Sequence, residues 1–297
     1  MKKIALNSAK QSTTMFLSAP DIEAKYKKLV NSQIAELIDK ISQLNKKDGF
    51  VKFVREDKSA IDDLITLLGV SEEKFKRVIS WIRIKRGYVF DAEWSSSAIR
   101  QKMLQDNKIM DLIFELITEG YRSPTLTSVI PSFILDDFRL DLSRLTLLKN
   151  RDYVCHLIKS SLSTKYNSEY CTYYDNIVGK KIREIANHTR SLYEPNSVIP
   201  NTPFTGVAYI EMGGKYIIIN SKFYLTTSSS QTRYAEHLQN ISATAQSYAN
   251  IIVINMLDGA GWIGRSADYN KIYYACKYFL NLNNIGQLEN IVNELNQ

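Results

Sequence analysis

The stretch GVAYIEMGGKYIIINSKFY, residues 206–224, ends in two polar side chains whose types and spacing could support chemistry. Asn220 and Lys222 are two residues apart, and side chains at that spacing point to the same face of a β-strand. An amide oxygen can ligate a hard cation, and an ammonium group can stabilise negative charge that develops during a reaction. The pair therefore indicates a site for an anionic substrate, or else the ordinary polar end of a strand.

The residues that follow this stretch form an ordered series of motifs. KFY precedes the Ser-rich turn TTSSSQ, a helical segment, the apolar run NIIVINML and the turn DGAGW. In this order, residues 204–262 resemble the C-terminal part of the type II restriction endonucleases that cut GATC, within the PD-(D/E)xK nuclease superfamily. Asp258, Gly259, Gly261 and Trp262 match the Asp-Gly-x-Gly-Trp turn of that group.

The resemblance implies Mg²⁺-dependent, site-specific hydrolysis of duplex DNA. In such nucleases two carboxylates hold the metal and a lysine stabilises the developing charge. The resemblance places Lys222 at the lysine position, Gly206 and Asn220 at the positions of the two acids, and Asp175 on the preceding helix, in YYDNIVGKKI. It also implies a homodimer, because a twofold-symmetric DNA site calls for a twofold-symmetric protein.

Both acid positions hold other residues in this chain. The first falls at Thr205-Gly206-Val207 and the second at Asn220, so the expected metal site has lost two charges. Three explanations are open. The chain is an engineered inactive form, or a naturally degenerate subunit that binds DNA without cutting it, or an enzyme that recruits Glu211, Asp175 or Glu184 instead. We take Asn220 and Glu211 as the candidate metal ligands.

Two further segments offer candidate contacts with DNA. One is SSSQTR, residues 228–233, whose hydroxyls could instead cap the following helix through Ser230 or Thr232. The other is the basic helix 74–86, which could equally be a solvated face. The candidates are Ser228, Ser229, Ser230 and Arg233 in the first segment, and Arg83, Lys85 and Arg86 in the second.

The elements that must position these residues change in character along the chain. Residues 20–120 carry apolar side chains at helical spacing, whereas residues 206–258 contain β-rich runs, with a hairpin turn at Gly213-Gly214. We therefore expect an α/β (α+β) protein with a helical N-terminal half and a restriction-endonuclease-like small mixed sheet flanked by helices. We expect residues 1–165 to be a mainly helical DNA-binding or dimerisation region and residues 166–297 to be the nuclease-like core.

Composition limits the other classes of function. The 297 residues carry 38 Lys and Arg against 31 Asp and Glu, a net charge of +7 that suits a polyanionic partner but also an ordinary basic surface. No apolar run is long enough for a membrane span, and the N-terminal residues lack the apolar stretch of a signal peptide. Three widely spaced cysteines indicate a reducing compartment, so we expect a cytoplasmic location.

Overall fold

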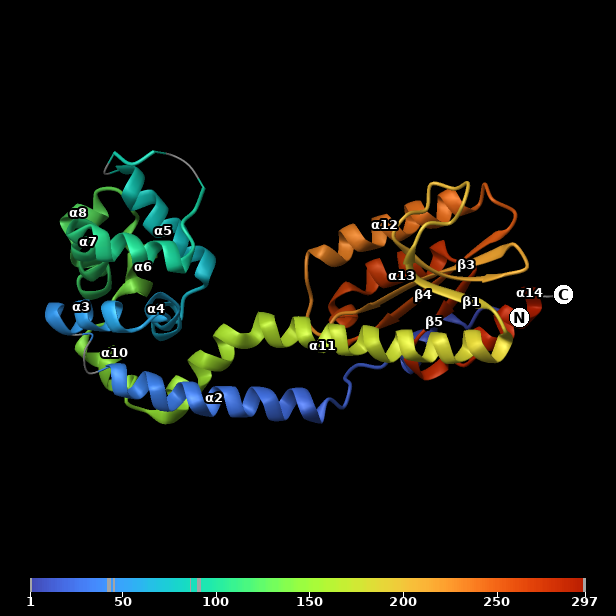
Figure 1. Ribbon diagram of the computed structural model, residues 1–297, viewed down its shortest axis with the longest axis horizontal. Helices are drawn as coiled ribbons and strands as arrows, with labels where there is room; N and C mark the ends of the chain where they lie inside the picture. The colour runs from blue at the N-terminus through green and yellow to red at the C-terminus, as the bar shows by residue number, and fades with distance from the viewer. Residues whose placement is uncertain (1, 42–43, 45, 86, 90–91, 296–297) are drawn as a thin grey trace. The chain divides into compact units, whose positions relative to one another are not determined.

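The computed structural model describes residues 2–41, 44, 46–85, 87–89 and 92–295. It confirms the expected fold class, with a helical N-terminal half and a mixed sheet flanked by helices (Figure 1). The chain forms two compact units. We call Glu23–Tyr166 the helical unit, and Met1–Ile22 together with Asn167–Gln297 the sheet unit. The expected division between residues 165 and 166 lies next to this boundary, but the first 22 residues pack with the sheet unit instead of the helical region.

The helical unit consists of helices joined by short loops. They are α2 (Pro20–Ile41), α3 (Lys47–Glu56), α4 (Ala60–Leu68), α5 (Glu72–Lys85), α6 (Ser96–Gln105), α7 (Asn107–Thr118), the 3₁₀ turns at Gly120–Arg122 and Asp136–Phe138, the short α8 (Pro124–Thr127), α9 (Ser132–Leu135) and α10 (Leu142–Leu147), and the start of α11 (Arg151–Thr189). None of the helices among the described residues is both long and apolar enough to cross a membrane.

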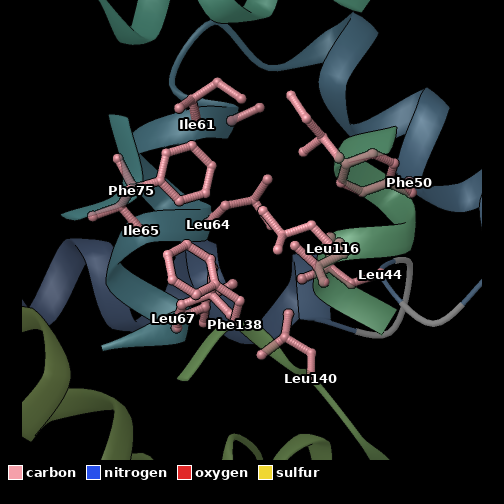
Figure 2. Packing of buried hydrophobic residues seen from close by; sticks show 14 of the residues in the cluster. Leu44, Phe50, Ile61, Leu64, Ile65, Leu67, Phe75, Leu116, Phe138 and Leu140 are labelled. Carbon is pink, nitrogen blue, oxygen red and sulfur yellow. The ribbon is translucent and has the colours of Figure 1, made fainter. Parts of the chain in front are cut away.

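One apolar core holds this unit together (Figure 2). Phe75 and Phe138 lie fully buried with their rings stacked at 6.0 Å. Local signals set the helix ends around it: Gly69, with φ +62°, ends α4, and the Ser71 hydroxyl accepts a hydrogen bond from the Lys74 N–H at the start of α5. Burial of the apolar helix faces therefore drives the assembly, and local caps help to set the end of α4 and the start of α5.

The sheet unit contains a five-stranded sheet in the order β1-β2-β3-β4-β5. The strands are β1 (Leu192–Ser197), β2 (Val207–Met212), β3 (Lys215–Phe223), β4 (Ile251–Asp258) and β5 (Tyr278–Leu280). β2 is antiparallel to both of its neighbours, β1 and β3, whereas β3, β4 and β5 run parallel. Gly213 and Gly214 form the expected hairpin turn between β2 and β3 with φ of +60° and +77°, a conformation that other residues adopt at a cost.

Helices cover both faces of this sheet (Figure 1). α12 (Ser230–Ala245) and α13 (Ser266–Ala275) pack on the face that carries Ile218 and Val253. α11 packs on the other face, where the Tyr174 ring lies 5.2 Å from the Phe223 ring. The unit also contains α1 (Leu6–Ser12), the 3₁₀ segments Ala260–Arg265 and Leu282–Asn284, and α14 (Gln287–Leu295).

The DGAGW segment joins the N-terminal residues to this sheet. The carboxylate of Asp258 is completely buried and accepts hydrogen bonds from the Thr14 N–H at 2.7 Å, the Leu282 N–H at 2.8 Å and the Tyr174 hydroxyl at 3.0 Å. The N–H of Gly259 also donates to the Thr14 carbonyl at 2.8 Å. These bonds explain why the first residues belong to the sheet unit.

Glycine at position 259 is required by close backbone packing. Its φ is +107°, and a Cβ atom there would lie 2.2 Å from the carbonyl oxygen of Tyr224. The N–H of Gly261 donates to the same carbonyl oxygen at 2.8 Å. The turn thus fixes the backbone that continues from β3, next to the residues singled out by the sequence.

Candidate functional site

A cleft of about 670 Å³ lies in the sheet unit, where β2 begins and β3 approaches its end. Its walls come from α11, from α12, from β1, and from the segments that lead into and along β2 and β3. Asp175, Gly206 and Asn220 all line it, although they are far apart in sequence. The structure thus brings together three of the four candidate catalytic residues in one concave site.

Asn220 is held by a buried neighbour. It lies opposite Asn255 in the parallel register of β3 and β4, and its Nδ2 donates a hydrogen bond to the Asn255 Oδ1 at 2.9 Å. Asn255 is completely buried, and its own Nδ2 donates to the carbonyl oxygen of Ile272 in α13 at 3.2 Å. The second bond orients the Asn255 amide so that its oxygen faces residue 220, where it requires a donor.

The charge on Lys222 acts on Asp175 at this end of the sheet. Asp175 is an exposed residue, yet the surrounding protein desolvates its carboxylate enough to raise its pKa, while the charge on Lys222 lowers the pKa. Lys222 is half-buried, and its Nζ lies 5.9 Å from the centre of the Tyr224 ring. Lys222 stands beside the cleft as the fourth candidate, outside the residues that line it.

Gly206 enters the cleft in a left-handed backbone conformation, with φ +66°. A Cβ atom at this position would meet the Asn196 Oδ1 at 3.4 Å, a tight but tolerable approach. Asp and Asn accept this conformation better than most side chains do. Thr205 also lines the cleft and has no positive φ, so either position could present a carboxylate there.

Glu211 lies at the opposite end of β2 from Gly206. Its Oε1 accepts a hydrogen bond from the Gly214 N–H at 2.9 Å, within the hairpin turn. Glu211 pairs with Tyr216, four positions along β3 from Asn220, which corresponds to a separation of roughly 13 Å along the strand. The structure does not bring Glu211 and Asn220 together as ligands of one ion.

The donor set of the cleft does not fit the Mg²⁺ site that the resemblance implies. Asp175 is the single carboxylate among the described residues that line the cleft, and the amide of Asn220 adds an oxygen but no charge. Among the described residues, no group of three or more His, Cys, Asp and Glu side chains is placed to hold a metal ion. A hard divalent cation is normally held by several oxygen ligands, including carboxylates.

The Ser-rich segment forms a local turn before α12. The Ser228 hydroxyl accepts from the Ser230 N–H at 3.2 Å, and the helix cap is Ser229, whose side chain makes no capping bond. Thr232 donates to Asp268 at 2.8 Å, so neither Ser230 nor Thr232 caps the helix as considered above. The Ser229, Ser230 and Arg233 side chains are exposed, and their contact with DNA stays a prediction.

The candidate DNA contacts on the basic helix 74–86 differ in their exposure to solvent. Arg83 is buried, with its guanidinium 4.4 Å from the centre of the Trp94 ring and a hydrogen bond to the Ala92 carbonyl at 2.8 Å. It is therefore a packing residue, and the hypothesis that it contacts phosphates is wrong. Lys85 is exposed, with its Nζ 4.5 Å from the centre of the Trp81 ring. Arg86 lies outside the described residues.

Sequence reasoning missed the basic side chains of the cleft. Lys180 and Arg183 line it from α11, and His237 lines it from α12. A signal was present in the sequence, because Asn176, Lys180 and Arg183 follow one another at spacings of four and three residues, which places them along one helix face next to Asp175. Only the position of α11 beside the sheet reveals that this face borders the cleft.

Comparison of the chain with protein-family models, curated proteins and solved structures found no match. The similarity of residues 204–262 to GATC-cutting endonucleases therefore stays a hypothesis that depends on the motifs themselves.

Proposed function

We propose that this protein is a relative of type II restriction endonucleases that binds duplex DNA and cuts it very slowly or not at all. The observation that carries the proposal is the shared cleft of Asp175, Gly206 and Asn220, with Lys222 beside it. These are the positions at which the resemblance expects an active site. The net charge of +7 also suits a polyanionic ligand.

The cleft has the backbone elements expected around such a site, but it lacks most of the expected acidic side chains. One carboxylate and one amide leave a divalent ion held mainly by solvent and DNA, so activation of water would be weak. Binding and cleavage are therefore separable in this chain. A homodimer is part of the proposal, because restriction sites are commonly twofold symmetric.

The proposal is tested with two matched duplexes that differ in one central sequence, GATC in one and GTAC in the other. We expect both to bind in fluorescence anisotropy with Ca²⁺ present, with affinity that falls steeply as salt rises. A parallel incubation with Mg²⁺ should leave both duplexes largely uncut. Absence of binding at every salt concentration would contradict the proposal. Rapid cleavage would show that other side chains hold the metal in place of the missing carboxylates.

A further inference from the structure

The side chains that line the cleft favour an anion over a cation. Lys180 and Arg183 contribute two positive charges against the one carboxylate of Asp175 among the described lining residues. The ammonium group of Lys222 adds to this balance, because it is close enough to affect the pKa of Asp175. A site for a divalent metal has the opposite composition, with carboxylates in excess.

The neutral side chain of Asn220 also contributes to the positive charge balance of the cleft. A carboxylate there would face the side-chain oxygen of Asn255, which accepts from Asn220 at 2.9 Å. The buried Asn255 is oriented by its own bond to Ile272, so it cannot turn its amide nitrogen toward the cleft without losing that bond. A carboxylate at position 220, where the resemblance expects an acid, would therefore face an acceptor and cost stability.

Arg183 is placed at the cleft by contacts with β1. Its guanidinium carbon lies 5.9 Å from the centre of the Tyr193 ring, a distance that allows a cation–π contact. Gly179, one turn earlier in α11, lies beside the same tyrosine: a Cβ atom on Gly179 would make an ordinary contact with the Tyr193 hydroxyl, at 4.0 Å. Burial raises the pKa of Tyr193, so its hydroxyl stays a neutral donor beside the arginine.

We infer that the cleft binds the phosphate of a phosphodiester directly, through Lys180 and Arg183 beside the neutral amide of Asn220, without a bound divalent cation. Guanidinium and ammonium groups recognise phosphate oxygens by charge-assisted hydrogen bonds. The identity of the ligand as DNA rests on the function proposed above. The anion-binding character rests on the charges and contacts of the cleft itself.

The test measures binding of the full chain to a mixed-sequence duplex by fluorescence anisotropy in EDTA, so that no divalent ion is present. Arg183→Gln and Lys180→Gln should each weaken binding about tenfold. Each should also lower the slope of log K against log salt by about 0.9, the value for one lost phosphate contact. Lys181→Gln is the matched control, since Lys181 is an exposed neighbour on the same helix that does not line the cleft.

Asp175→Asn separates the anion site from a metal site. Removing its charge should tighten binding severalfold in EDTA, because the carboxylate repels a phosphate in the same cleft. A carboxylate that holds a metal would also repel phosphate in EDTA, so the response to divalent ions decides between the two sites. Stimulation of DNA binding by Mg²⁺ or Ca²⁺ in the native chain but not in Asp175→Asn would show a metal site and overturn the inference. Binding by the native chain that does not increase when these ions are added supports the inference.

Inorganic phosphate separates failure of this inference from failure of the proposed function. If phosphate raises the thermal midpoint of the native chain but not of Arg183→Gln, and DNA does not bind, the anion site stands and the proposed function fails. If DNA binds but Arg183→Gln and Lys180→Gln bind it as Lys181→Gln does, the proposed function stands and the inference is wrong. Loss of affinity of equal size in all three variants would likewise overturn the inference in favour of diffuse surface charge.

Discussion

Asn220 donates its side-chain N–H to the oxygen of the fully buried Asn255 at 2.9 Å. The two residues are 35 positions apart and meet because β3 and β4 are parallel neighbours in register. The bond connects the floor of the cleft to the core beneath α13. The amide at position 220 therefore contributes to stability as well as lining the cleft.

Asn220→Asp should destabilise the protein. The change removes the donor to Asn255 and sets two oxygens against each other, which should cost about 1–3 kcal/mol of unfolding free energy. Urea denaturation measures the loss. Asn176→Asp is the matched control, because it adds the same charge at the cleft from an exposed position. Equal stability of the two variants would show that the Asn220–Asn255 bond contributes little.

Restoring the acids should create nuclease activity. Asn220→Glu combined with Thr205→Asp or Gly206→Asp should raise Mg²⁺-dependent cleavage of duplex DNA by several orders of magnitude, since two carboxylates can hold the metal. Thr205→Asp is expected to be the better tolerated, because the left-handed conformation at Gly206 costs about 1 kcal/mol for other residues. Gel-based cleavage assays measure the rates.

Lys222→Ala in the restored protein provides the second half of that test. It should remove most of the gained activity, because the lysine acts on charge that develops only during the reaction. The restored protein should also bind DNA more weakly than the native chain in EDTA, since the new carboxylates repel phosphate. If every restored variant binds DNA but none cuts it, the fold serves binding alone.

Gly259→Ala should be strongly destabilising. Its Cβ would lie 2.2 Å from the Tyr224 carbonyl oxygen at a φ of +107°, so the backbone must shift, at an expected cost of about 3 kcal/mol or more. Gly213→Ala is the control, because its φ is also positive but no atom lies within 4 Å of its Cβ. Its cost should be about 1 kcal/mol. Chemical denaturation that gave both variants the same midpoint would contradict this account of the DGAGW turn.

Stability should depend on the ionisation of Asp258. Burial raises its pKa to about 6, although hydrogen bonds from Thr14, Leu282 and Tyr174 lower it. An unfolded Asp ionises near pH 4, so the folded state holds the proton more tightly and loses roughly 2–3 kcal/mol from this group as the pH rises from about 4 to above 6.

Urea denaturation between pH 4 and 8 measures this loss for the native protein and for Asp258→Asn. The variant has no carboxyl group at this position, so the difference between the two curves isolates the contribution of Asp258. The native stability should fall relative to the variant over this range. Parallel curves would show that Asp258 is ionised in the folded protein throughout the range.

Signals that act over a few residues could be predicted from the sequence alone. Adjacent glycines indicated the turn at Gly213-Gly214, and the change from helical apolar spacing to β-rich runs indicated the fold class. Each of these depends on local backbone preferences or on which face of an element is apolar. Such preferences are written in neighbouring residues and do not depend on the rest of the chain.

Contacts between distant segments were decided by the tertiary structure. The partner of Asn220 follows from the register of β4, and the cationic wall of the cleft follows from the placement of α11. The burial of Arg83 against Trp94 and the attachment of residues 1–22 to the sheet unit are further examples. These contacts need packed elements whose relative positions arise from burial of the whole core, so no short pattern in the sequence could encode them.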